Sequence, residues 1–165
     1  MRKVFLLAII LFFVASTCFA NAARELVRSE NKTLTTNMIT WKAYDIKSYS
    51  MKVIYAAGNR PDTLFEFKVE NKKVVSCLRD EIPLTDFSGV KQYTIDEMHN
   101  SAKKLLKQNK KNSPMIYLVK YDETYGYIVS MVRIYNPKAK AALGPEDFNY
   151  RIKVFDFVPE ESPKK

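Results

Sequence analysis

The sequence predicts an α+β domain in which two helices pack on an antiparallel sheet. Several segments alternate apolar and polar residues, which is typical of strands with one buried and one solvated face. Two other segments carry apolar residues at helical spacing. The chain also contains ten Tyr, ten Phe and only four Gly among its 165 residues, a composition that favours a sheet-rich core over disorder.

The first helix is predicted to begin at Thr33, because Leu34, Met38 and Trp41 then fall on one apolar stripe. Trp41 is the only tryptophan of the chain. We expect its side chain to be buried in the core, where it would anchor this helix on the sheet.

Three strands are predicted next, at residues 49–55, 64–70 and 73–78. In the second of them, Phe65, Phe67 and Val69 alternate with charged residues, as in a half-buried antiparallel strand. A tight turn at Asn71-Lys72 would join this strand to the third, because Asn tolerates a positive φ.

The second helix has a clear start. Thr94 is a suitable N-cap, and Glu97 follows three residues later, which is the spacing of a capping box. The segment Asn112-Ser113-Pro114 is expected to end the helix. Its apolar stripe consists of Ile95, Met98, Ala102, Leu105 and Leu106.

A second set of strands is predicted at residues 115–121, 127–135 and 148–158, with a longer connection at residues 137–145. The predicted order is therefore α-β-β-β-α-β-β-β. Two copies of an αβββ unit would give this order, although the two halves share no motif that can be aligned. Residues 33–158 are predicted to form a single domain, and residues 159–165 a tail.

Residues 1–22 have the layout of a secretory signal peptide. Arg2 and Lys3 precede an apolar run of about a dozen residues, which is shorter than the roughly 20 that a membrane-spanning helix needs. The segment Ala20-Asn21-Ala22 ends in small residues, so we expect cleavage after Ala22, with Ala20 as the alternative. The mature chain would then be periplasmic or secreted, with residues 23–32 as a flexible lead-in.

Cys18 offers a second interpretation of this region, as the lipid-bearing cysteine of a bacterial lipoprotein. Thr17 stands where such a site normally has a smaller residue, so lipid anchoring is the less favoured alternative. If Cys18 leaves with the signal peptide, Cys77 remains alone and cannot form an internal disulfide.

The chain is basic, with 27 Lys and Arg against 18 Asp and Glu. Arg2 and Lys3 are the basic residues of the predicted signal, which leaves a net charge of +7 for the mature chain. Such a charge suits an anionic neighbour, either an unknown protein or an anionic component of the cell envelope. The lysine cluster at residues 103–111 is interpreted as a solvated helix end, and no nucleic-acid binding is expected.

The sequence offers little catalytic chemistry. It has one histidine, His99, and the motifs of phosphate-binding, dinucleotide-binding and serine-hydrolase sites are missing. A Cys77–His99 nucleophile pair is conceivable, but a small buried cysteine is the better interpretation. We therefore predict no catalytic, cofactor-binding or metal-binding residues, and leave enzymatic activity open but disfavoured.

The most distinctive segment joins two predicted strands and contains Tyr121, Asp122, Tyr125, Gly126 and Tyr127. Asp122 can accept hydrogen bonds from backbone amides further along the chain, and Gly126 can adopt a positive φ, so a specified turn is predicted. The tyrosines add flat area and hydroxyl groups of the kind that interfaces use. We therefore treat these five residues as a candidate contact surface as well as a turn.

The spacing Tyr-Asp-x-x-x-Gly-Tyr resembles a bacterial family of domains of unknown function that occur in secreted proteins and lipoproteins. The chain departs from the family pattern at Glu123 and Ile128, where the family has proline, and at Lys72, where it usually has glycine. The resemblance implies a shared fold over most of residues 35–157 but no known activity. Its other motifs are the Trp41-containing helix, Ser48-Tyr49-Ser50, residues 69–75, Tyr93-Thr94-Ile95-Asp96 and Asp147-Phe148-Asn149-Tyr150.

Together these features favour an exported, non-enzymatic binding or interaction domain of the bacterial cell envelope. Two alternatives remain at this point. One is a small enzyme with its site in an aromatic concavity of the sheet, and the other is an inhibitor of a secreted enzyme. A pocket with converging polar groups would help to separate them.

Overall fold

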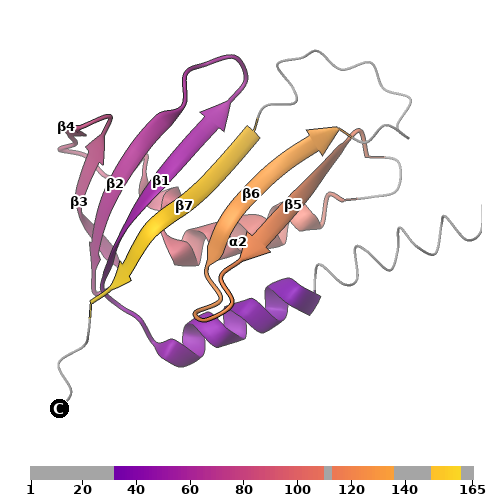
Figure 1. Ribbon diagram of the computed structural model, residues 1–165, viewed down its shortest axis with the longest axis horizontal. Coiled ribbons are helices and arrows are strands. Elements are labelled where there is room, and N and C mark those ends of the chain that lie inside the picture. The colour runs from indigo at the N-terminus through magenta and orange to yellow at the C-terminus, as the bar shows by residue number, and fades with distance from the viewer. Residues whose placement is uncertain (1–31, 110–112, 136–149, 161–165) are drawn as a thin grey trace, which may run out of the picture.

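The computed structural model describes residues 32–109, 113–135 and 150–160, and it confirms an α+β fold. Seven strands form one antiparallel sheet in the order β4-β3-β2-β1-β7-β6-β5 (Figure 1). The strands are β1 (Tyr49–Ala57), β2 (Thr63–Glu70), β3 (Lys73–Arg79), β4 (Ile82–Pro83), β5 (Met115–Tyr121), β6 (Ile128–Tyr135) and β7 (Tyr150–Pro159).

Helical structure lies at two places in the described chain. The first helix is seen over residues 32–44. A short 3-10 helix, η1 (Lys91–Tyr93), leads into α2 (Ile95–Leu106). The six predicted strands correspond to β1, β2, β3, β5, β6 and β7, whereas β4 and η1 were not predicted, so the observed order is longer than the predicted one. No helix within the described ranges is long and apolar enough to span a membrane.

The strand order gives no support to a duplicated αβββ unit. β1, the first strand of the first set, lies at the centre of the sheet beside β7, whereas β5, the first strand of the second set, lies at an edge. The predicted signal peptide at residues 1–22, the predicted connection at 137–145 and most of the predicted tail lie outside the described residues. Residue 32, which the lead-in was expected to include, already belongs to the first helix.

One face of the sheet carries the core. In β1, Tyr49, Met51 and Val53 are at most 2% exposed and point to this face, as their alternation predicts. α2 crosses behind the strands in Figure 1, with the first helix below it. Ile95 and Met98 of α2 are fully buried against the sheet. Each fully buried side chain of this size contributes about 1.5–3 kcal/mol to the free energy of folding.

The other face of the sheet carries paired charges. Lys52 lies 3.4 Å from Glu66 on the neighbouring strand and 3.8 Å from Asp156. Lys68 is paired in the same way, with Glu70 at 2.8 Å and Glu160 at 3.7 Å. Exposed pairs of this kind contribute little stability, but they neutralise the lysines that take part in them.

The start of α2 differs from the predicted capping box. Thr94 is the N-cap residue, but its hydroxyl donates to the carbonyl of Lys91 at 2.9 Å instead of accepting from the helix. η1 brings that carbonyl within reach of Thr94. The hydroxyl of Tyr49, on β1, accepts a hydrogen bond from the backbone N–H of Ile95 at 3.1 Å, so a distant strand residue caps the helix.

Two tight turns use backbone with positive φ. Asn71 and Lys72 have φ of 46° and 64°, which confirms the predicted turn between β2 and β3. Asp80 and Glu81, at 50° and 70°, make a second such turn that leads into β4. No turn was predicted here, although Asp, like Asn, tolerates a positive φ.

Candidate functional site

The segment from Asp122 to Tyr127 forms the specified turn that the sequence predicts. The Asp122 carboxylate accepts hydrogen bonds from the backbone N–H groups of Thr124, at 3.0 Å, and Tyr125, at 2.7 Å. Gly126 has a φ of 74°. Asp122 and Gly126 therefore both form the turn in the way that the sequence predicts.

Gly126 also brings this turn against the two helices. A Cβ atom at this position would lie 2.5 Å from the backbone oxygen of Asn37 and 3.1 Å from Cβ of Thr40, both in the first helix. The Gly126 carbonyl accepts a hydrogen bond from Nε2 of His99, in α2, at 3.0 Å. Both the close approach to the first helix and the positive φ therefore require glycine at this position.

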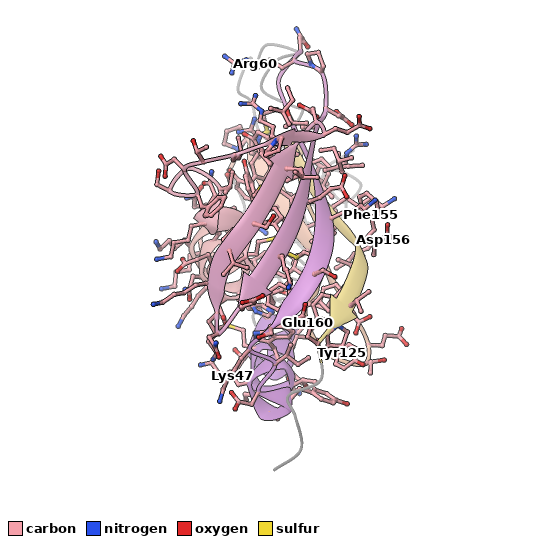
Figure 2. All side chains as sticks on the ribbon, turned by 90° about the vertical axis from the view of Figure 1, so that its left-hand side faces the viewer. Lys47, Arg60, Tyr125, Phe155, Asp156 and Glu160 are labelled. Carbon is pink, nitrogen blue, oxygen red and sulfur yellow. The ribbon has the colours of Figure 1, made fainter. Side chains whose placement is uncertain are left out.

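The tyrosines of the turn pack inward, which differs from the exposed rim that a contact surface would require. The ring of Tyr127 is 9% exposed and lies 4.5 Å, between centroids, from Phe157. Tyr125 is half-buried beside the first helix, at the end of the sheet opposite Arg60 (Figure 2), and its ring centroid is 5.8 Å from that of Phe157. Tyr121 stacks on His99 with ring planes 12° apart. Partner binding by these residues stays a prediction.

The buried histidine and cysteine hold structural roles. His99 is 2% exposed, and burial lowers the pKa of its imidazole, so the neutral ring with its proton on Nε2 binds Gly126. Cys77 is also 2% exposed, and burial raises the pKa of its thiol to about 11. A thiol in that state is a poor nucleophile, which agrees with the interpretation of Cys77 as a small buried side chain. No group of metal-binding side chains occurs in the part of the chain that the structure describes.

A surface groove runs between the β2–β3 turn and the segment that precedes α2. One wall is formed by residues 71–74 and the other by residues 85–88 together with Lys91. Its volume of about 730 Å³ is large enough for several side chains of a partner. The two apolar members, Val74 and Phe87, are half-buried and pack against the core.

The groove has an excess of positive charge. Lys72, Lys73 and Lys91 are exposed, and none of them forms an ion pair with a carboxylate in the described ranges. Asp86 is the only acidic residue among the described ones that line the groove. Its carboxylate accepts hydrogen bonds from the backbone N–H and hydroxyl of Ser88, at 2.9 and 2.8 Å, and these bonds lower its pKa.

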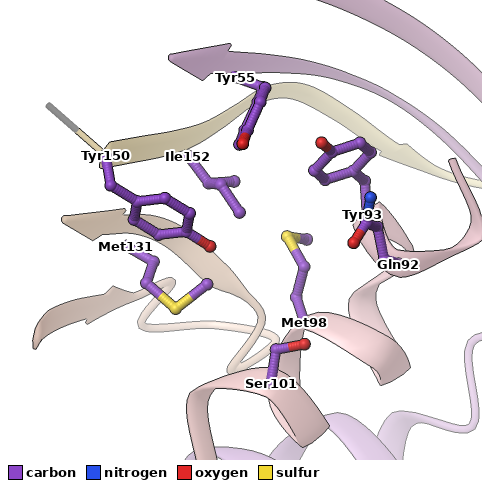
Figure 3. A pocket seen from close by; sticks show the side chains of 8 residues that line it. All are labelled: Tyr55, Gln92, Tyr93, Met98, Ser101, Met131, Tyr150 and Ile152. Atoms are coloured by element: carbon purple, nitrogen blue, oxygen red, sulfur yellow. The ribbon is translucent and has the colours of Figure 1, made fainter. Parts of the chain in front are cut away.

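A second, smaller hollow lies in the core face of the sheet, above α2 (Figure 3). This cavity, which we call the tyrosine cavity, has a volume of about 90 Å³. Its polar lining consists of Tyr55, Gln92, Tyr93, Ser101 and Tyr150, and its apolar lining of Met98, Met131 and Ile152. The residues come from β1, β6, β7, η1 and α2, so only the tertiary structure brings them together.

Sequence reasoning missed both hollows. Lys72 lies in a recognisable turn and Lys73 follows it, so their exposure could have been predicted, but Lys91 lies near them only through the fold. Tyr55 and Tyr150 lie on strands that were predicted correctly, yet which strands are neighbours was not known. Comparisons with protein-family models, with curated proteins and with solved structures find no match to this chain.

Proposed function

We propose that this protein is an exported binding domain of the bacterial cell envelope, and that its groove docks an acidic, extended segment of a partner protein. The proposal of export rests on the signal-like layout of residues 1–22. The proposal of docking rests on one observation, which is the set of unpaired lysines around the groove.

The contrast with other lysines supports this choice. Lys52 and Lys68 each lie near two carboxylates, so their charges are satisfied within the fold. Lys72, Lys73 and Lys91 have no such partner among the described residues. A cluster of unpaired charges attracts a partner of opposite sign and speeds its association.

The shape and composition of the groove favour a peptide over a uniformly charged polymer. Val74 and Phe87 offer apolar contacts that a polysaccharide or polyphosphate would not use. β3 pairs with β4 only through Leu78 and Arg79, so the rest of that edge has no strand partner among the described residues. An extended segment with alternating acidic and apolar side chains would suit both features.

The alternative of a small enzyme would place its site in the tyrosine cavity, which is an aromatic concavity of the sheet. The described lining of that cavity contains no carboxylate, imidazole, thiol or amine. The hydroxyls of Ser101 and the three tyrosines therefore have no such group in the described lining to activate them, which favours binding over nucleophilic chemistry.

Peptide binding by charge-matched variants tests the docking proposal. A labelled peptide of alternating Glu and Leu should bind the purified protein, and fluorescence anisotropy would follow its titration. Replacement of Lys72, Lys73 and Lys91 by Gln should weaken binding at least tenfold. Replacement of the exposed Lys103, Lys104 and Lys107 by Gln changes the net charge equally and should change the Kd by less than twofold. Equal weakening in both variants, or tighter binding of polyglutamate than of the peptide, would contradict a specific peptide groove.

Mass spectrometry of the protein recovered outside the cytoplasm tests the export proposal separately. The expected species begins at Ala23. A lipid-modified species that begins at Cys18 would instead support the lipoprotein alternative, and an intact N-terminus would contradict cleavage.

A further inference from the structure

We propose that the tyrosine cavity is a binding site for a compact oxyanion, that is, the carboxylate or phosphate group of a small molecule. This inference is independent of the groove, because the two hollows share no lining residue. It rests on the direction of the hydroxyl groups, their protonation, the neighbouring charges and the size of the space.

Three phenol groups point into the cavity from different elements. Figure 3 shows the hydroxyls of Tyr55, Tyr93 and Tyr150 directed toward one another across the space. The ring of Tyr55 lies 5.5 Å from that of Tyr93 and 6.1 Å from that of Tyr150, between centroids. Within the described part of the chain, no hydrogen bond joins these hydroxyls to a protein group. Hydroxyls that line a hollow without a protein partner are available to hydrogen-bond a guest molecule.

The hydroxyls of Tyr93 and Tyr150 remain protonated at neutral pH. Burial raises the pKa of both Tyr93 and Tyr150 to about 12, and the neighbouring tyrosines raise it further. Each therefore presents an O–H donor and would gain most from an acceptor that carries negative charge, because charge-assisted hydrogen bonds are about twice as strong as neutral ones.

Two arginines act electrostatically on the tyrosines of the cavity. The guanidinium of Arg133 lies 5.8 Å above the ring of Tyr150, and its Nε is buried without a hydrogen-bond partner among the described residues. Positive charge from Arg133 lowers the pKa of Tyr150, and positive charge from Arg79 lowers that of Tyr93, although burial outweighs both effects. The same positive potential would stabilise an anion in the cavity.

The size of the cavity restricts the ligand to one small group. A volume of about 90 Å³ is several times the roughly 10–15 Å³ that one water molecule needs, and well below the roughly 300–1,000 Å³ of sites for drug-sized ligands. Met98, Met131 and Ile152 supply apolar walls, which limit the access of water and strengthen hydrogen bonds to the guest. A carboxylate or phosphate could enter as the end group of a larger molecule.

Two-dimensional NMR of the purified full chain tests the proposal with three probes at constant pH and ionic strength. The probes are sodium acetate, sodium phosphate and glycerol, which is neutral. We expect saturable shifts at Ser101 and at Arg133 Nε–H with acetate or phosphate and none with glycerol, and the two anion arms would identify the preferred group. Tyr150→Phe should weaken the binding at least tenfold, while the exposed Tyr44→Phe should leave it unchanged.

Three results would overturn the proposal. They are shifts that do not saturate with either anion, equal shifts with glycerol, and an unchanged Kd in a folded Tyr150→Phe protein. If thermal melting shows that Tyr150→Phe is not folded, Tyr55→Phe provides the same comparison from β1. Loss of peptide binding to the groove variants would not affect this outcome, so the two proposals can fail separately.

Discussion

Aromatic side chains fill the space between the sheet and its helices in two clusters that are covered differently. In the packed cluster, the first helix and the turn at residues 122–127 close the space, and ring centroids lie 4.5–6.0 Å apart. In the tyrosine cavity, similar spacings leave an open volume of about 90 Å³. The packed cluster consists of Trp41, Tyr49, Tyr127 and Phe157, and the cavity is bounded by Tyr55, Tyr93 and Tyr150.

The difference shows that residue type alone does not decide whether an aromatic cluster is core or site. The Tyr49 hydroxyl has a structural partner, the N–H of Ile95, and so belongs to the fold. The hydroxyls of the cavity have none among the described residues and point into open space. The packed cluster and the tyrosine cavity therefore differ less in their aromatic rings than in whether the tyrosine hydroxyls have a hydrogen-bond partner within the described protein.

The largest effect should come from breaking the packed cluster at Trp41. Its side chain is 3% exposed, and its Nε1–H donates to Asp96 at 3.1 Å. Trp41→Ala should reduce the free energy of unfolding by about 3–5 kcal/mol, as large core truncations do, measured by chemical denaturation. A wild-type fluorescence maximum typical of water-exposed tryptophan would contradict this placement.

Gly126 closes the packed cluster by bringing the turn against the first helix. Gly126→Ala should cost about 1–3 kcal/mol, because it combines a positive φ with a clash against the Asn37 backbone. Gly89→Ala is the matched control, since a Cβ there meets no atom within 4 Å. Thermal melts that show equal shifts for the two variants would mean that the turn can move away from the helix.

Removal of one tyrosine hydroxyl from each region compares the stability of the packed cluster and of the tyrosine cavity most directly. Tyr49→Phe leaves the Ile95 N–H of α2 without its partner and should cost about 1–2 kcal/mol. Tyr150→Phe should change stability by no more than about 0.5 kcal/mol, because its hydroxyl has no structural partner among the described residues. Chemical denaturation of both variants measures the difference, and an equal loss would place Tyr150 in the structural core.

Tyr125 lies at the margin of the packed cluster, beside Tyr44 and Phe157 at 5.0 and 5.8 Å. Tyr125→Ala should cost about 1 kcal/mol, since each aromatic contact contributes roughly 0.5–1.5 kcal/mol. A melting temperature equal to that of the unaltered protein would restore the interpretation of Tyr125 as an exposed contact residue.

His99 gives the packed cluster a dependence on pH. Burial lowers its pKa below the ordinary value of 6.5, with Lys42 acting in the same direction and Asp96 and the Gly126 carbonyl in the opposite one. The unfolded chain therefore binds more protons than the native chain just below pH 6.5, and stability should fall as the pH drops through this window. His99→Gln should flatten the dependence just below pH 6.5, as followed by denaturant midpoints. An unchanged pH slope would show that another group titrates.

The sequence by itself determined much of the local structure. Alternation placed the strands close to their observed bounds, because one face of each strand meets the core and the other meets water. Trp41 was predicted to be buried from its place on the apolar stripe. Asp122, Gly126 and Asn71 specified their turns through backbone chemistry that acts within a few residues.

Only the tertiary structure decided how these elements meet. The turn tyrosines face inward because the first helix covers them, and Tyr49 replaces the predicted capping box because β1 passes the start of α2. The groove and the tyrosine cavity depend on which strands are neighbours, and periodicity carries no information about strand order. Local patterns report the polarity of each residue's surroundings, whereas a site needs side chains that are distant in sequence to converge, and that convergence is set by the packing of the whole domain.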